Sequence, residues 1–221
     1  KGAREGIAIL AKAQTAGKGR MGRFFFSPPR SGIYMSILLR PDFSHEELNF
    51  LTPMAAVAVS EAIEKISGEK NEIKWVNDIY MKDKKVCGIL TEASLGEDKI
   101  NYAIIGIGVN LEPPRSGFPK EIENIAGGIF SKAPEGAFEA LYKEIYDNIL
   151  AYYHKFKDKE FVEKYIEKCT YLKGKEITVS DGKTSYTATA GVPDRECRLK
   201  VTAANGKEIF LYSGEANIVR S

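Results

Sequence analysis

The sequence has little of the side chains on which metal and nucleophile chemistry most often depends. Its 221 residues include two histidines, His45 and His154, and three cysteines, with no Cys-x-x-Cys pair. A His/Cys zinc site and a Ser-His-Asp triad are therefore not expected. An odd number of cysteines without close pairs fits a reducing, cytoplasmic setting. The chemistry is expected to depend on lysine, arginine, carboxylates and backbone groups.

Long apolar runs are also missing. No run approaches the ~18 residues that a membrane-spanning helix needs, and no secretory leader pattern opens the chain. We therefore expect no membrane partner. The formal net charge is only +2 at pH 7, so an anion site must come from local clustering of charge.

Such a cluster exists, because acidic side chains are absent from residues 6–41. The same stretch carries the cations Lys12, Lys18, Arg20, Arg23, Arg30 and Arg40. Its centre, residues 17–23 (Gly-Lys-Gly-Arg-Met-Gly-Arg), is called the basic glycine loop below. Glycines let a backbone approach a ligand closely, and amides and guanidinium forks suit phosphate or carboxylate oxygens. The loop predicts an anion site, with a solvated basic loop as the alternative.

Two segments partly match nucleotide-binding motifs. The loop satisfies Gly-x-Gly-x-x-Gly, but a dinucleotide fingerprint needs a helix that opens directly after it. Residues 24–29 read Phe-Phe-Phe-Ser-Pro-Pro, which cannot start that helix. The segment Gly182-Lys183-Thr184 lacks the upstream glycine of a P-loop. Neither motif is expected to function here.

The hydrophobic pattern predicts a mixed α and β chain. Strands are expected at 6–12 and 33–39, a helix from Thr52-Pro53 to Gly68, an antiparallel meander at 72–76, 86–93 and 101–109, an irregular segment at 111–134, and helices along 138–156 and 160–170. After Lys173 come five short runs, at 176–180, 184–190, 198–203, 207–212 and 216–219, with turn signals at Asp181-Gly182 and Asn205-Gly206. These runs predict a small barrel.

Three further blocks carry candidate site residues, each with a structural alternative. Asp78 can hold Mg²⁺ or make an Asx turn. Lys85 can point inward as a fixed charge, although the neighbouring lysines also suit a solvated hairpin turn. Gly106 and Gly108 share one strand face. They indicate close approach of a ligand, or else a bulge or tight strand packing.

Taken in order, the four blocks resemble the biotin protein ligase family. Residues 17–23 are similar to its Gly-Arg-Gly-Arg-x-Gly-Arg signature, with Lys18 in place of the first arginine. Residues 74–78 resemble Lys-Trp-Pro-Asn-Asp, with Val76 in place of proline. Residues 85–90 and 106–110 look like its Lys-x-x-Gly-Ile-Leu and Gly-x-Gly-x-Asn segments. Lys18 keeps the charge but loses the planar bidentate fork of arginine.

The resemblance implies an α+β fold. Its central mixed, largely antiparallel sheet is flanked by helices, as in class II synthetase-like biotin ligases, and is followed by a small SH3-like β-barrel. It divides the chain into a catalytic biotin- and ATP-binding domain at 1–172 and an SH3-like domain at 173–221. The family's Ser-Thr-Asn segment and the helix-turn-helix domain of repressor-type members are not found. We therefore expect the N-terminal part of the catalytic domain to be missing, and DNA is not an expected partner.

The resemblance also implies an activity. Biotin is activated with ATP to biotinyl-5′-AMP, with Mg²⁺ accompanying ATP, and is then transferred to a lysine of a biotin carboxyl carrier protein or domain. A homodimer remains open. By resemblance, the catalytic residues are Arg20 and Lys85, and biotin is bound by Gln14, Gly17, Lys18, Gly19, Arg20, Lys85, Gly106 and Gly108. ATP is bound by Arg20, Met21, Arg23, Lys74, Asn77 and Asn110, and Asp78 is the candidate for Mg²⁺.

Two rival functions remain. A lipoate–protein ligase would activate a different acid, and the basic glycine loop argues against it. A non-catalytic nucleotide- or single-strand nucleic-acid-binding module would use the loop together with the aromatic residues 24–26. That module predicts strongly salt-dependent binding without biotin-dependent turnover of ATP.

Overall fold

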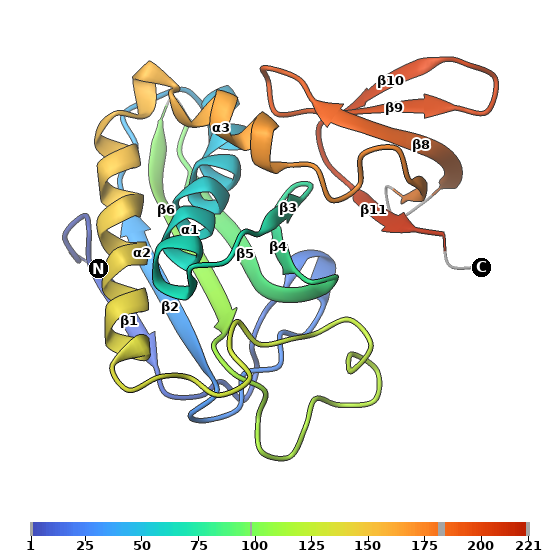
Figure 1. The fold of residues 1–221 in the computed structure, drawn as a ribbon. Helices are drawn as coiled ribbons and strands as arrows, with labels where there is room; N and C mark the ends of the chain where they lie inside the picture. Colours follow the sequence, from blue (N-terminus) through green and yellow to red (C-terminus); the bar gives the residue numbers. More distant parts are fainter. Residues whose placement is uncertain (1, 98, 181–183, 220–221) are drawn as a thin grey trace.

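The computed structural model describes residues 2–97, 99–180 and 184–219. The Asp181-Gly182 turn signal and most of the rejected P-loop segment lie outside these ranges. The larger of two sheets is antiparallel, in the order β1-β2-β6-β5-β4-β3 (Figure 1). Its strands are β1 (Ala8–Ala11), β2 (Gly32–Leu39), β3 (Glu72–Lys74), β4 (Asp78–Met81), β5 (Lys84–Leu95) and β6 (Ile100–Asn110).

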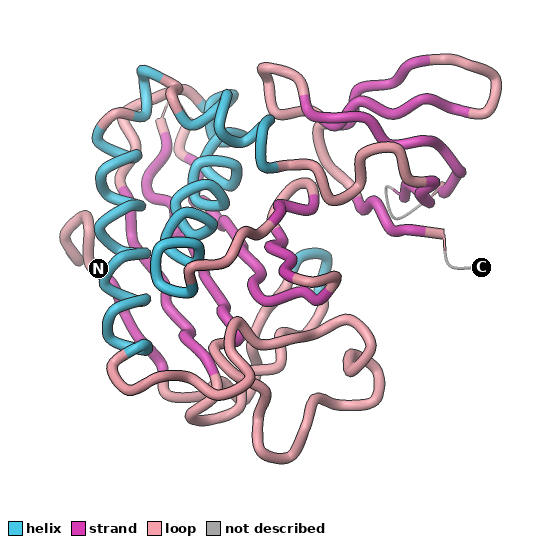
Figure 2. The backbone as a smooth tube through the Cα atoms, viewed as in Figure 1, coloured by secondary structure: helices cyan, strands magenta, loops and turns pink. Residues whose placement is uncertain are grey.

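Helices cover one face of this sheet, as Figure 2 shows in cyan. They are α1 (Leu51–Ser67), α2 (Ala137–His154) and α3 (Phe161–Lys168). Ile33, Ile37 and Leu39 alternate along β2 and are fully buried, because every second side chain of a strand points to the same face. The opposite face is left for the glycines and for the basic glycine loop.

Helix α1 is the central element of the helical layer. It follows a short 3₁₀ helix (His45–Phe50), so it begins at Leu51 rather than at the predicted Thr52-Pro53. Pro53 lies in its first turn, where a missing amide hydrogen costs nothing. Gly68 ends the helix in the left-handed region, with φ 72°.

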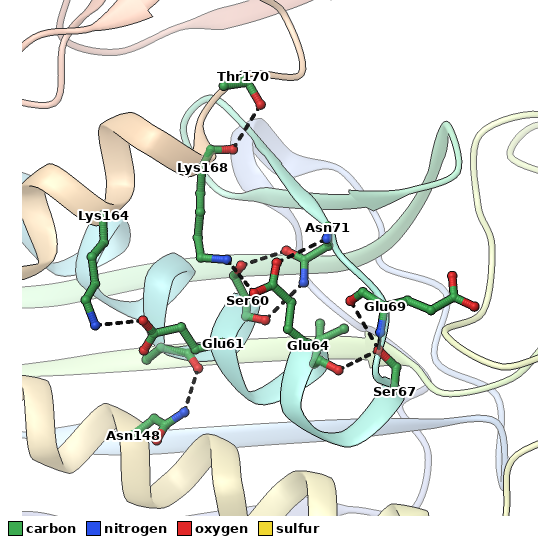
Figure 3. A network of polar contacts seen from close by, with 12 residues as sticks. Ser60, Glu61, Glu64, Ser67, Glu69, Asn71, Asn148, Lys164, Lys168 and Thr170 are labelled. Carbon is green, nitrogen blue, oxygen red and sulfur yellow. Dashed lines mark hydrogen bonds and ion pairs between the residues drawn. The ribbon is translucent and has the colours of Figure 1, made fainter.

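A polar network fixes α1 against its neighbours (Figure 3). Lys164 and Lys168 of α3 form ion pairs with Glu61 and Glu64 of α1, each at 2.8 Å. Inside the network, the buried Ser60 hydroxyl donates to Asn71 Oδ1 at 2.6 Å. These contacts satisfy the buried polar groups of Ser60 and Asn71. Since Asn71 directly precedes β3, they also fix the position at which that strand begins.

The smaller sheet follows α3. Its strands are β7 (Glu176–Ser180), β8 (Ser185–Pro193), β9 (Leu199–Ala203), β10 (Glu208–Leu211) and β11 (Glu215–Ile218), in the order β10-β9-β8-β7-β11. This sheet is open rather than closed, and it fits the SH3-like type. The predicted fold class is thereby confirmed, whereas the exact domain boundary at 172/173 stays a prediction.

One strand was missed. The predicted meander has no strand between 76 and 86, with Asn77-Asp78 as an interruption of the apolar run, whereas β4 pairs there with both β3 and β5. The turn that joins β4 to β5 has Lys82 and Asp83 at φ 50° and 59°. Such positive values belong to a type I′ turn, which glycine or asparagine usually signals. A Lys-Asp turn gives no such signal.

Among the described residues, no helix is long and apolar enough to span a bilayer.

Trp75 connects the two sheets. Its side chain is 4% exposed, and its Nε1 donates to the carbonyl oxygen of Cys197, between β8 and β9, at 3.0 Å. We expect Trp75→Phe to lower the free energy of unfolding by about 1–3 kcal/mol, because the buried carbonyl loses its donor. Urea denaturation followed by circular dichroism measures this without the lost tryptophan signal. Tyr102→Phe, at an exposed tyrosine, is the control and should leave stability unchanged within ~0.5 kcal/mol.

Candidate active site

A cavity of about 460 Å³ opens among the basic glycine loop, β5, β6 and the first residues of β11. All but two of the predicted site residues line it. Those that do are Gln14, Lys18, Gly19, Arg20, Arg23, Lys74, Asn77, Asp78, Lys85, Gly106, Gly108 and Asn110. Segments far apart in sequence therefore meet around one space, although the role of each residue stays a prediction.

Gly17 and Met21 do not line the cavity. A Cβ at Gly17 would collide with the carbonyl oxygen of Phe25 and lie 2.8 Å from Gln14 Oε1. Gly17 therefore lets the loop fold tightly. Met21 is 54% exposed, with φ 53°, and lies at the outer tip of the loop.

The basic glycine loop is the end of an irregular hairpin. Its two sides are joined at Gln14 with Ser27 and at Lys18 with Phe24. Gly19 N donates to the carbonyl oxygen of Arg23 at 2.7 Å. No helix follows the loop, because a turn with Arg30 at φ 65° leads directly into β2 at Gly32. This arrangement excludes the dinucleotide fingerprint, as predicted.

Glycines form the floor of the cavity. Gly88 of β5 and Gly108 of β6 are directly opposite each other, and Gly106 is opposite Leu90. The ring of Phe25 covers the first pair so closely that a Cβ at Gly108 would overlap it. A Cβ at Gly106 would approach nothing closer than the Leu90 carbonyl oxygen, at 3.4 Å. The space above Gly106 is thus open to a ligand.

Lys85 points toward the cavity, unlike the other lysines of its turn. Its Nζ lies 2.7 Å from Asp78 Oδ1, and both side chains are largely buried. Lys82 instead pairs with Glu69 at the surface. Lys85 N also donates to the carbonyl oxygen of Ile125 at 2.7 Å. The start of β5 is therefore fixed by a segment that the sequence pattern left as irregular.

Two further cations are held by polar side chains and backbone. Arg20 donates to Asn77 Oδ1 at 3.3 Å and to the carbonyl oxygen of Gly214 at 3.4 Å. Lys74 donates to Asn217 Oδ1 at 3.1 Å. Burial lowers the pKa of Lys74, and the nearby Asp78 carboxylate partly offsets this. An anion placed beside Lys74 would favour its charged form.

Cations outnumber acids around the cavity. The lining cations are Lys18, Arg20, Arg23, Lys74 and Lys85, and the lining acids are Asp78, Glu92 and Glu215. Two of the acids are paired, Asp78 with Lys85 and Glu215 with Arg23. The surplus of positive charge in a partly enclosed space favours an anionic ligand.

Several lining residues were not predicted. The sequence suggests a role for Phe25 only in the nucleic-acid alternative, and it predicts no function for Glu215 and Asn217 in the 173–221 domain. Apolar side chains from the irregular segment also line the cavity: Phe118, Ile122 and Ile125. The sequence does contain a signal for these three residues, because large apolar side chains in a loop rich in Pro and Gly indicate that the loop covers a binding site or a neighbouring surface.

Comparison with known proteins agrees with this geometry. The family model for the Biotin/lipoate A/B protein ligase family matches residues 1–110. The chain is 44% identical over 131 residues to the bifunctional ligase/repressor BirA of Bacillus subtilis, covering 59% of this chain and 40% of that protein. It is 35% identical over 105 residues to the biotin–[acetyl-CoA-carboxylase] ligase of Paracoccus denitrificans, covering 47% and 43%. The chain thus matches less than half the length of these curated relatives.

A solved structure extends the likeness to the whole chain. The biotin protein ligase from Aquifex aeolicus, in complex with biotin and ATP, superposes with a TM-score of 0.81 at 29% identity, covering 100% of this chain and 92% of that one. The likeness in fold therefore includes the second sheet. The chain belongs to the biotin/lipoate A/B protein ligase family.

Proposed function

We propose that this chain is a biotin protein ligase that forms biotinyl-5′-AMP from biotin and ATP and transfers biotin to a carrier lysine. The observation that carries the proposal is the convergence of cations from the basic glycine loop, β3 and β5 on one cavity with a glycine floor. The relatives named above, whose descriptions include biotin ligation, support the choice of substrate.

The first step joins two anions. An oxygen of the biotin carboxylate attacks the α-phosphorus of ATP, and pyrophosphate leaves with the electrons of the broken P–O bond. Arg20 and Lys85 neutralise the carboxylate and the α-phosphoryl oxygens in this proposal. Arg23 and Lys74 bind phosphate oxygens, and Asn77 and Asn110 bind the nucleotide. No covalent enzyme intermediate is needed.

The second step releases AMP. The amine of a carrier lysine attacks the carbonyl carbon of the mixed anhydride, an amide bond forms, and the amine gives up a proton. Biotin lies over the open Gly106, with Gln14 and Lys18 lining its pocket, and Gly108 leaves room for the Phe25 ring that borders the ligand. Because the intermediate is sensitive to water, the basic glycine loop and Phe25 protect it in this proposal by covering the floor.

Mg²⁺ enters this proposal with the nucleotide. Among the described residues, no group of three His, Cys, Asp or Glu side chains is placed to hold a metal ion. The Asp78 carboxylate already lies against Lys85. The side chains therefore do not fit a metal site built by the protein alone. Asp78 as a Mg²⁺ ligand stays a prediction, as do the homodimer and the cytoplasmic location.

The test is adenylate synthesis. We expect the purified chain, given biotin and ATP with magnesium, to release pyrophosphate and to yield biotinyl-5′-AMP detectable by mass spectrometry. Omission of biotin is the control and should abolish release. A carrier domain added afterwards should gain one biotin on lysine.

Two results would contradict the proposal. Release supported by lipoate but not by biotin would indicate a lipoate ligase. Salt-sensitive binding of single-stranded nucleic acid, with no biotin-dependent release, would indicate a non-catalytic module.

A further inference from the structure

The cations assigned to the nucleotide contact the C-terminal sheet. Arg23 forms an ion pair with Glu215, the first residue of β11. Lys74 donates to Asn217 on the same strand, at 3.1 Å. Arg20 donates to the carbonyl oxygen of Gly214 at 3.4 Å. One end of β11 therefore holds three cations that come from two separate segments of the larger sheet's domain.

The strand presents these groups from a fixed position. Glu215 pairs with Ser180 and Asn217 with Thr178 across β7, so their side chains share one face. Ala216 between them is 3% exposed. Asn217 Nδ2 also donates to Glu215 Oε2 at 3.3 Å, which joins the Arg23 contact to the Lys74 contact.

Glu215 is an unexpected residue in an anion site. A carboxylate beside nucleotide phosphates repels them, so attraction to ATP does not account for it. Its side chain is 19% exposed, against 63% for Arg23. The carboxylate is therefore the fixed member of the pair, and the arginine of the loop is the member that gains a defined position.

We propose, building on the proposed function, that Glu215 is a positioning residue of the ligase. Its ion pair with Arg23 fastens the basic glycine loop to β11 before the nucleotide arrives, and the Asn217 contact places Lys74 beside it. The C-terminal sheet then forms part of the ATP site, although its described residues that line the cavity include no cation. The opposite role, in which Glu215 competes with phosphate for Arg23, predicts an effect of opposite sign.

Glu215→Gln separates the two roles, because it keeps the shape of the side chain and removes its charge. We expect the KM for ATP to rise about tenfold, which corresponds to a free-energy change of ~1.4 kcal/mol. The KM for biotin and kcat should stay within about twofold of wild type. Glu208→Gln is the matched control, because Glu208 pairs with Lys200 in the same sheet, away from the cavity.

Loop order is measured separately, without any substrate. Trypsin cleavage after Lys18 and Arg20, followed by mass spectrometry, should be about tenfold faster in Glu215→Gln than in wild type, because an unfastened loop opens more often. The exchange variant that combines Arg23→Glu with Glu215→Arg rebuilds the ion pair in reverse. It should be cleaved at the wild-type rate.

The proposal is overturned by a lower KM for ATP in Glu215→Gln, which would show competition. Unchanged cleavage in that variant, or fast cleavage in the exchange variant, would also overturn it. A wild-type chain that fails to turn over ATP with biotin would contradict the proposed function instead. The cleavage rates would still decide whether Glu215 fastens the loop.

Discussion

Lys85→Ala is expected to slow adenylate formation by about 10²–10³-fold, the loss typical of removing one fixed charge donor from a transition state. Lys85 Nζ is held 2.7 Å from Asp78 within the cavity. Without the ammonium, two anions must meet beside an unpaired carboxylate. A pyrophosphate-release assay at saturating biotin and ATP measures the effect, and kcat should fall more than either KM rises.

The matched control for this variant is Lys82→Ala. It removes the same charge from the same turn, and Lys82 pairs with Glu69 outside the cavity. Its rate should stay within about twofold of wild type. A Lys85→Ala enzyme that releases pyrophosphate at a near wild-type rate would exclude Lys85 from the chemistry, and equal losses in both variants would point to a general charge effect.

Gly108→Val is expected to weaken biotin binding by about 100-fold or more. Even a Cβ at this position overlaps the Phe25 ring, so valine must displace the ring and fill the floor of the cavity. Overpacking of this kind costs ~1–3 kcal/mol before the ligand is considered. Isothermal titration calorimetry with biotin measures the loss.

A second variant distinguishes ligand volume from strain in the protein. In Gly106→Ala the new methyl group comes no closer than 3.4 Å to the Leu90 carbonyl oxygen, so the unliganded protein accommodates it. We expect it to weaken biotin binding by about tenfold with an unchanged melting temperature. Wild-type affinity in both variants would refute the assignment of the biotin pocket to this floor.

The site could be predicted as far as local signals extend. The uncompensated charge of the basic glycine loop and the paired glycines of β6 are visible in short windows of sequence. Antiparallel pairing puts Asp78 opposite Gly88 and Gly88 opposite Gly108, and the loop reaches the same cavity because Phe25 lies against both glycines. The helices were predictable for a similar reason, because their apolar stripes repeat over several turns.

The remaining site residues depend on contacts that no short window contains. Glu215 meets Arg23 across 192 positions of the chain, and the sequence predicts only a short barrel strand at 216–219 directly after it. Phe25 covers the glycines because the loop folds back over β6. The sequence of the loop alone does not predict this fold-back. Strand β4 was missed because a Lys-Asp turn with positive φ at both residues has no glycine to mark it.

The clustering of cations has a thermodynamic consequence for the chain as a whole. Lys18 and Arg20 are separated from Lys74 and Lys85 by more than 50 positions of the chain, and the two pairs line one cavity only in the folded protein. Their mutual repulsion therefore opposes folding, and an anion that binds among them relieves it. Such an anion binds only the native state, so at 100 times its dissociation constant it adds about 2.7 kcal/mol to the unfolding free energy. The binding of an anionic substrate and the folding of this protein are therefore thermodynamically linked.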